Sequence, residues 1–314
     1  MTSEPVAAID CGTNSIRLLI TQAGRDLVRQ MRIVRLGRGV DRTGRLDPAA
    51  LERTRVALAD YKRLIDEHHA GRVRMVATSA TRDAANAGDF HDMVVATLGR
   101  PAEVITGEEE AALSFAGAVA DLPPGRTCLV VDIGGGSTEF VRGRDAVERS
   151  ISVDIGCVRM TERHLHSDPP AAAELDAAVA DIGRAVRGAL SHVGGSVSGS
   201  VGGSRAESLV GLAGTVTTMG GMALGLPRYD PHRIHHSVLT AGAVEEIADR
   251  LSKLDHEGRA AIPVMHPGRV DVIIAGALIL REIMRSTGVA EVIVSEHDIL
   301  DGIAASIKRS GAEQ

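Results

Sequence analysis

A chain of 314 residues is longer than one hydrophobic core ordinarily supports, which predicts two domains. Aromatic residues make up only 2% of the chain and tryptophan is absent, which argues against nucleic-acid binding by base stacking. The formal net charge is −6, so a polyanionic partner would have to be held by a local basic patch rather than by the overall field.

The cysteines and the amino-terminal segment indicate where the protein works. Cys11, Cys128 and Cys157 have neither a metal-ligand spacing nor an even-numbered disulfide framework, which predicts a reducing, cytoplasmic setting. The first residues contain no basic segment followed by an apolar run. We therefore expect no signal peptide and no membrane association.

The first half of the chain alternates strands with helices, which is typical of an α/β unit whose sheet faces are covered. Asp47 and Pro48 supply a helix N-cap and an N1 proline, and apolar residues then recur at helical spacing. The elements expected are a hairpin within 6–20, a third strand at 26–34, a glycine-punctuated loop at 35–46, a helix from Asp47 to His69, strands at 73–78 and 102–106, and helices ending near 98 and 119.

Seven arginines lie between Arg25 and Arg45 and face only two acidic residues in the same stretch, Asp26 and Asp41. The simpler interpretation is a solvated edge of the domain, because charged residues usually line surfaces. The alternative is a basic lip that meets an anionic substrate.

The second half repeats the scheme after the segment D-L-P-P-G at 121–125, which predicts domains at 1–123 and 124–314. The last helix, at about 298–310, could pack back on the first domain. Residues 194–204 are all Gly, Ser or Val, a composition that predicts a flexible loop. The other elements expected are a hairpin from 128, a strand near 147–153, helices near 158–166 and 172–192, a strand at 209–213 entering a helix, a helical stretch at 269–285 and a strand at 291–295.

Two glycine-containing hairpins are the main candidates for chemistry. The stretch L-V-V-D-I-G-G-G-S-T-E-F-V begins at Leu129, and a shift of 122 positions places Asp10 on Asp132 and Ser15 on Ser137. A turn without side chains presents backbone N–H groups that can approach phosphate oxygens closely. A glycine-rich hairpin on its own can also be only a turn, and the second copy favours the phosphate-binding interpretation.

Further motifs narrow the interpretation. They are A-I-D-C-G-T-N-S-I-R-L at 8, T-S-A-T-R-D-A-A-N at 78, G-E-E-E-A at 107, V-D-I-G-G-G-S-T-E at 131, G-C-V-R-M-T-E at 156, G-L-A-G-T-V-T-T at 211 and R-I-H-H-S-V-L-T at 233. Over nearly its whole length the chain resembles the short, two-domain type of the Ppx/GppA phosphatases, within the actin and sugar-kinase superfamily. The resemblance implies an α/β fold of two actin-like (ribonuclease H-like) domains with an interdomain active-site cleft. Thr13 stands where a Ser is commoner, and S-E-H-D-I-L-D-G at 295 lacks an Arg that many members carry.

The resemblance also implies roles for particular residues. Glu110 would be the catalytic carboxylate, and Asp132 and Glu139, with help from Asp10, would hold Mg²⁺ or Mn²⁺, in keeping with the preference of Mg²⁺ for carboxylate, water and phosphate oxygens. Glu108 and Glu109 are equally well explained as first-turn acids of a helix. Asp10 could instead cap its own turn, and Arg17 or Arg82 could be surface ion pairs. The residues expected to bind substrate phosphate are Gly12, Thr13, Asn14, Ser15, Arg17, Arg82, Gly134, Gly135, Gly136 and Ser137.

A cluster of basic side chains follows residue 227. Its members are Arg228, His232, Arg233, His235 and His236. Their spacing is not that of a zinc site with Cys ligands, so we interpret them as a track for polyphosphate rather than a metal site.

Together these features predict an exopolyphosphatase that removes terminal orthophosphate from inorganic polyphosphate. The alternatives are a guanosine pentaphosphate (pppGpp) 5′-phosphohydrolase, an ATP-dependent kinase of the same superfamily, suggested by G-L-A-G-T at 211, and a module that binds guanosine tetraphosphate. The Glu110 motif argues against the kinase. The resemblance implies a homodimer, and we expect no nucleic-acid partner.

Overall fold

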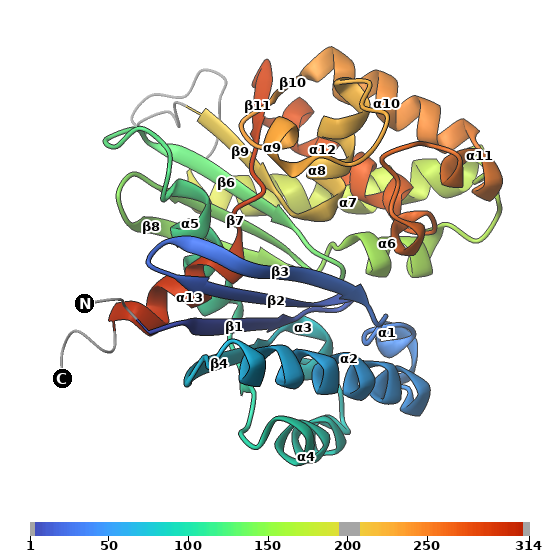
Figure 1. The fold of residues 1–314 in the computed structure, drawn as a ribbon. Helices are drawn as coiled ribbons and strands as arrows, with labels where there is room; N and C mark the ends of the chain where they lie inside the picture. Colours follow the sequence, from blue (N-terminus) through green and yellow to red (C-terminus); the bar gives the residue numbers. More distant parts are fainter. Residues whose placement is uncertain (1–3, 195–207, 310–314) are drawn as a thin grey trace. The chain divides into compact units, whose positions relative to one another are not determined.

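The computed structural model describes residues 4–194 and 208–309 (Figure 1). Its contacts divide the chain into one unit of Met1–Gly117 with Ile299–Gln314 and a second unit of Ala118–Asp298. The division precedes the D-L-P-P-G segment, and the last helix is grouped with the first unit. The Gly/Ser/Val stretch that we predicted to be a flexible loop lies, apart from Gly194, outside the described residues.

The first unit is built on a five-stranded sheet with the order β3-β2-β1-β4-β5. The first three strands pair antiparallel, and β4 and β5 run parallel to β1. The strands are β1 (Val6–Cys11), β2 (Ser15–Gln22), β3 (Arg25–Ile33), β4 (Arg72–Ala77) and β5 (Glu103–Val104). The expected strand at 102–106 is wrong in extent, because the chain enters helix α5 (Gly107–Val119) directly after Ile105: the Thr106 side chain accepts the Glu109 N–H at 3.2 Å and the Thr106 carbonyl accepts the Glu110 N–H at 2.9 Å.

Helices cover both faces of this sheet. On one face, Ala7, Ile9 and Cys11 pack against helices α2 and α4; on the other, Ala8 packs with residues of α5 and α13. Asp47 accepts a hydrogen bond from the Ala49 N–H, which confirms the predicted start of α2. The helices are α1 (Val40–Thr43), α2 (Pro48–Glu67), α3 (Ser79–Arg82), α4 (Ala87–Leu98), α5 (Gly107–Val119) and α13 (Ile299–Arg309). The predicted loop at 35–46 thus contains one helical turn, which buries Val40 and ends at Gly44 in the left-handed conformation.

The second unit repeats the topology of the first. Its six-stranded sheet has the order β10-β11-β9-β6-β7-β8, so β8-β7-β6-β9-β11 matches β3-β2-β1-β4-β5 and β10 is an added antiparallel edge. The strands are β6 (Cys128–Ile133), β7 (Thr138–Gly143), β8 (Val147–Val153), β9 (Ser208–Leu212), β10 (Val238–Thr240) and β11 (Glu291–Val294). The repeated hairpins therefore open two sheets of like construction, as the sequence predicted.

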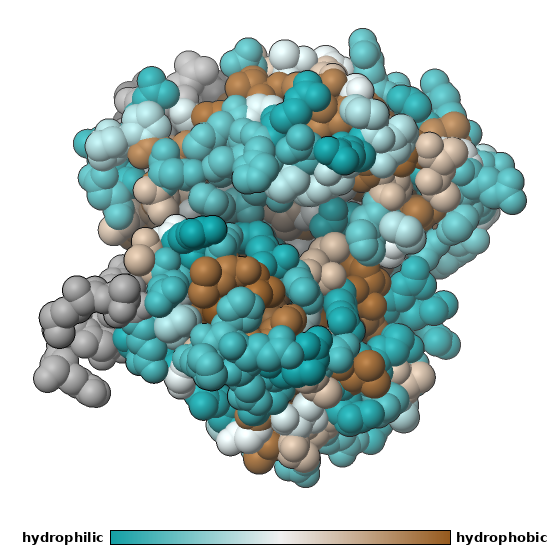
Figure 2. Space-filling model, in the orientation of Figure 1, coloured by the Kyte–Doolittle hydropathy of each residue, from teal (hydrophilic) through white to brown (hydrophobic). Residues whose placement is uncertain are grey.

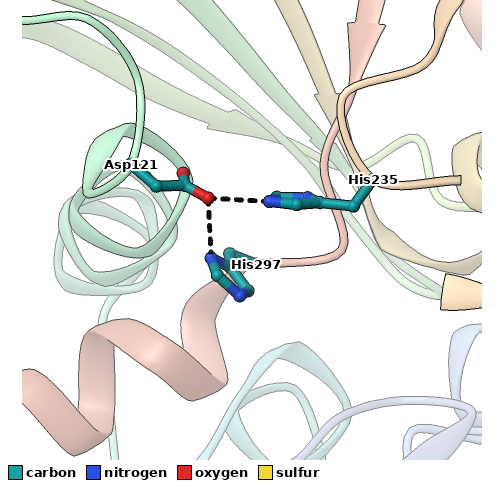
Figure 3. Close-up of side chains that lie close together, drawn as sticks. All are labelled: Asp121, His235 and His297. Carbon is teal, nitrogen blue, oxygen red and sulfur yellow. Dashed lines mark hydrogen bonds and ion pairs between the residues drawn. The ribbon is translucent and has the colours of Figure 1, made fainter. Parts of the chain in front are cut away.

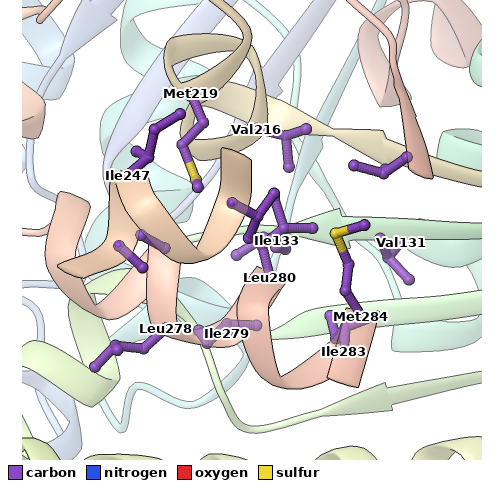
Figure 4. Close-up of a cluster of buried hydrophobic side chains, with 14 of the residues drawn as sticks. Val131, Ile133, Val216, Met219, Ile247, Leu278, Ile279, Leu280, Ile283 and Met284 are labelled. Atoms are coloured by element: carbon purple, nitrogen blue, oxygen red, sulfur yellow. The ribbon is translucent and has the colours of Figure 1, made fainter. Parts of the chain in front are cut away.

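Helix α12 lies at the centre of the second unit's core. Its residues Leu278, Leu280 and Ile283 are buried with Val131 and Ile133 of β6 (Figure 4). The helices of this unit are α6 (Cys157–His164), α7 (Ala172–Val193), α8 (Ala213–Ala223), α9 (Pro231–Ile234), α10 (Ala241–Lys253), α11 (His256–Ala260) and α12 (Ile273–Thr287), with a 3₁₀ turn at Pro267–Arg269. The helical stretch expected at 269–285 therefore begins later than expected: Arg269 ends the 3₁₀ turn, and α12 begins only at Ile273.

One face of the molecule is mainly polar (Figure 2). Figure 2 shows a face covered mostly by hydrophilic side chains, with small apolar patches between them. Within residues 4–194 and 208–309, no helix is both long and apolar enough to cross a membrane.

Candidate active-site residues

Two carboxylates face each other at the β6–β7 hairpin. Asp132 and Glu139 are directly paired across the antiparallel ladder, so their side chains lie on the same face of the sheet. They are only 8% and 1% exposed. The structure thus brings together the two acids that the sequence predicted to hold a metal.

The donor set at this hairpin fits a hard divalent cation. Two neighbouring carboxylates repel each other when both are ionised, and a cation with oxygen ligands relieves that repulsion. Ser152 donates a hydrogen bond of 2.7 Å to Glu139 Oε1, which orients one carboxylate. The hairpin closes through a 3.0 Å bond from the Gly134 N–H to the Ser137 carbonyl, so the glycines lie beside the acids.

The first hairpin has the same closure, because the Gly12 N–H donates to the Ser15 carbonyl at 3.0 Å. Thr13 Oγ1 lies 3.0 Å from Ser79 Oγ. This contact joins the first hairpin to the T-S-A-T-R-D-A-A-N motif. Sequence reasoning did not single out Ser79, although its place inside a recognised motif was a signal that could have found it.

Asp10 and Arg17 form a part-buried ion pair. They lie opposite each other in the β1–β2 ladder, and Arg17 donates to Asp10 Oδ2 from Nε at 2.9 Å and from a terminal nitrogen at 2.7 Å. The ion pair that the sequence left open for Arg17 is therefore observed, with Asp10 as its partner. The metal role of Asp10 and the phosphate role of Arg17 stay predictions.

The three acids of the G-E-E-E-A turn have different surroundings. Glu108 and Glu109 are exposed, whereas Glu110 is 9% exposed. Hydrogen bonds from its own backbone N–H and from Thr106 lower the pKa of Glu108, as expected for an acid at a helix start. Arg74 holds Glu109 at 2.6 Å. Glu110 is thus the buried acid of the three, whereas Glu108 accepts hydrogen bonds at the helix start and Glu109 pairs with Arg74.

Glu110 has Arg82 as a neighbour. A terminal nitrogen of Arg82 lies 3.5 Å from Glu110 Oε2 and donates a 2.9 Å hydrogen bond to the Ile105 carbonyl. The positive charge favours the ionised form of the carboxylate. The structure therefore brings together the two residues that the sequence assigned to catalysis and to phosphate binding in separate motifs.

The basic cluster after residue 227 is arranged differently from what we expected. His235 Nε2 lies 2.7 Å from Asp121 Oδ2, and His297 Nδ1 lies 3.3 Å from the same oxygen (Figure 3). His236 stacks on His235 with ring centroids 3.8 Å apart. Sequence reasoning missed both Asp121 and His297, which are distant in the chain from the predicted track.

Asp121, His235 and His297 are also a group whose ligand atoms could surround a metal ion. The tautomer of His235 argues against that use. Its Nδ1 accepts the Glu296 backbone N–H at 3.1 Å, so in the neutral ring Nε2 carries the proton and donates it to Asp121. A metal ligand would need a free electron pair at Nε2, so His235 and Asp121 are better described as a neutral imidazole that donates a hydrogen bond to a carboxylate.

The arginines between Arg25 and Arg45 are partly neutralised within the first unit. Arg29 pairs with Asp26 and Asp301, and Arg32 pairs with Asp60. Arg38, Arg42 and Arg45 are exposed. The solvated-edge interpretation thus holds for Arg29 and Arg32, and a basic lip would depend on the later arginines.

Comparison with known proteins shows what the chain resembles as a whole. Residues 20–310 match the model of the Ppx/GppA phosphatase family. The chain is 49% identical over 320 aligned residues to exopolyphosphatase 2 of Mycobacterium tuberculosis, covering 96% of this chain and 98% of that protein. A solved exopolyphosphatase-like protein is 38% identical with a TM-score of 0.92, covering 98% of this chain and 99% of the other.

A second solved relative, the Ppx/GppA family member of Aquifex aeolicus, is 32% identical with a TM-score of 0.80, and the match covers 99% of this chain and 98% of that one. The predicted fold class, two actin-like α/β domains, is confirmed by the two sheets and by these relatives. The interdomain cleft stays a prediction. By its sequence, its two repeated sheets and its relatives, the chain belongs to the Ppx/GppA phosphatase family.

Proposed function

We propose that this protein is an exopolyphosphatase that releases terminal orthophosphate from inorganic polyphosphate. The observation that carries the proposal is the pair of buried carboxylates, Asp132 and Glu139, facing each other beside a glycine turn. Additional support comes from the full-length similarity to a protein named exopolyphosphatase 2.

In this proposal each hairpin contributes to holding phosphate. The amides and hydroxyls of residues 12–15 and 134–137 donate hydrogen bonds to phosphate oxygens. Asp132 and Glu139 hold Mg²⁺ or Mn²⁺, which neutralises charge on the phosphates when it is bound. Arg82, which lies 3.5 Å from Glu110 Oε2, binds a phosphate oxygen.

Glu110 acts as the general base. Water attacks the terminal phosphorus, a new P–O bond forms, the bridging P–O bond breaks, and the proton passes from the water to the Glu110 carboxylate. The shortened polyphosphate leaves with the bridging oxygen. In this proposal both units carry residues that take part in the reaction.

The proposal also covers the cellular setting and the assembly of the protein. The cytoplasm is favoured because Cys11, Cys128 and Cys157 are buried and form no disulfide. A homodimer is proposed from the family resemblance alone.

One assay separates the candidate substrates. Orthophosphate release is measured from short polyphosphate, long polyphosphate, pppGpp and ATP, each with Mg²⁺ and with excess chelator. We expect metal-dependent release from polyphosphate. Faster release from pppGpp would favour the guanosine pentaphosphate phosphohydrolase, and transfer to an added acceptor from ATP would favour the kinase. Turnover of none of them, with tight guanosine tetraphosphate binding, would favour the regulatory module.

A further inference from the structure

The carbonyl groups of Gly134, Gly135 and Gly136 in the β6–β7 turn face the start of helix α6. The Cys157 N–H donates to the Gly134 carbonyl at 2.9 Å, and the Gly135 carbonyl accepts from Val158 at 2.9 Å and from Arg159 at 3.1 Å. The first amides of a helix have no partner within the helix, so here they hold the turn.

Arg159 holds the third carbonyl with its side chain. Its Nε donates a 2.8 Å hydrogen bond to the carbonyl of Gly136. The side chain is 14% exposed, so this bond is largely shielded from water. A guanidinium Nε–H is a donor that no other side chain reproduces at the same position.

Gly156 allows this close approach. A Cβ atom at residue 156 would lie 2.2 Å from the Gly135 carbonyl oxygen and 2.5 Å from the Gly136 nitrogen. These are backbone atoms, so a side chain there would displace the turn. The glycine is therefore required by packing, since its φ of −122° is accessible to any residue.

The direction of the carbonyls decides the direction of the amides. In a trans peptide unit, the carbonyl of one residue and the N–H of the next point to opposite sides. Because the carbonyls of Gly134, Gly135 and Gly136 point toward α6, the N–H groups of Gly135, Gly136 and Ser137 point away from it. These are three of the residues expected to bind phosphate.

The first unit anchors its own turn in the same way. The Thr13 carbonyl accepts from the Gly37 N–H at 2.8 Å, and the Asn14 carbonyl accepts from Val34 at 3.0 Å and Arg35 at 2.9 Å. A Cβ atom at Gly37 would lie 2.3 Å from the Thr13 Cγ2 atom. The segment after β3 thus holds carbonyls of the β1–β2 turn, as the segment after β8 holds carbonyls of the β6–β7 turn.

We propose that Gly156 and Arg159 are positioning residues for phosphate binding: they fix the turn carbonyls on α6 so that the turn amides face the substrate. Without this anchor a peptide unit can rotate and present a carbonyl oxygen, which repels a phosphate oxygen. The proposal rests on the proposed function, because it concerns the same phosphate turn.

The test measures phosphate binding as well as turnover. Affinities for inorganic phosphate and pyrophosphate are measured by calorimetry with Mg²⁺, alongside KM and kcat for polyphosphate and the Tm. The variants are Gly156→Ala, Arg159→Met and Arg159→Lys. Gly188→Ala is the matched glycine control, since a Cβ there meets nothing within 4 Å.

We expect Arg159→Met to weaken phosphate binding and raise KM by roughly tenfold, as for a lost charge-assisted hydrogen bond, with a smaller change in kcat. Arg159→Lys should not restore binding, because its ammonium lacks the Nε–H at that position. Gly156→Ala should weaken binding at least as much, and Gly188→Ala should leave it unchanged.

Three outcomes overturn the proposal. The first is unchanged phosphate affinity and KM in both Arg159→Met and Gly156→Ala. The second is full restoration by Arg159→Lys, which would assign the effect to charge alone. The third is a lower Tm with unchanged KM in these variants, which would give Gly156 and Arg159 a role in stability alone. If Gly156→Ala does not fold, the comparison of Arg159→Met with Arg159→Lys decides. The proposed function can also fail on its own. If the wild-type protein binds phosphate more tightly than Arg159→Met does but hydrolyses no substrate, the proposed function is refuted and this inference stands.

Discussion

Asp132 lies directly opposite Glu139 in the β6–β7 ladder, and both carboxylates are buried. Two acids so placed are compatible with a stable fold when a cation or donor groups offset their charge. Ser152 is one such donor to Glu139.

Glu139→Gln is expected to weaken Mg²⁺ binding by at least about tenfold and to lower kcat in proportion, because one of two anionic ligands is lost. Mg²⁺ should raise the Tm of the wild-type protein but not that of the variant. Ser152→Ala is the milder comparison, since it removes only the hydrogen bond to that carboxylate. Full activity of the wild-type protein in excess chelator would contradict the prediction.

Glu110→Gln is expected to lower kcat by roughly 10²- to 10⁴-fold with little change in KM, because the amide keeps the shape of the side chain but cannot accept a proton. Glu108→Gln and Glu109→Gln are the controls from the same turn. Each should cost less than about tenfold, since Glu108 lies at the helix start and Glu109 pairs with Arg74. Near-normal kcat in Glu110→Gln would place the base elsewhere.

The His235 ring should make stability depend on pH. Burial lowers the pKa of His235, opposed by its hydrogen bond to Asp121 and reinforced by the nearby His236 and His297. A lowered pKa in the folded state means that the unfolded chain binds the proton more readily, so this contribution to stability is lost as the pH falls below about 6.5.

The measurement compares the Tm of the wild-type protein and His235→Gln between about pH 8 and pH 5. Glutamine keeps an N–H donor but does not titrate, so the variant should lose less stability in acid than the wild-type protein. The difference between the two curves isolates His235 from His236 and His297, which also face Asp121. Parallel curves would show that His235 contributes nothing to the pH dependence.

The exposed arginines after β3 should contribute to polyphosphate binding. Arg38→Gln combined with Arg42→Gln is expected to raise KM for long polyphosphate more than for short polyphosphate and to reduce the salt dependence of KM, because fewer phosphates are neutralised. Arg55→Gln is the control, since Arg55 is exposed but pairs with Glu52. Equal effects on KM for long and short polyphosphate would rule out a basic lip at Arg38 and Arg42.

Local features of the fold follow from the sequence because their causes lie within a few residues. Asp47 and Pro48 predict the start of α2, and glycines followed by Ser137 predict the β6–β7 turn. The apolar runs on either side of the glycines predict the two strands, so Asp132 and Glu139 were expected at one hairpin. The repeated motif predicted two like sheets, which the matching strand orders bear out.

Contacts between distant segments were decided only by the tertiary structure. No local pattern indicates that Asp121 meets His297, that Thr13 contacts Ser79, or that α6 holds the β6–β7 turn, because such contacts depend on how whole elements pack. The family, the two hairpins and the candidate chemical groups can all be recognised in the amino-acid sequence. The tertiary structure decided which of those groups are neighbours and which way the turn amides point, since free energy of packing over many residues outweighs the preferences of any short segment.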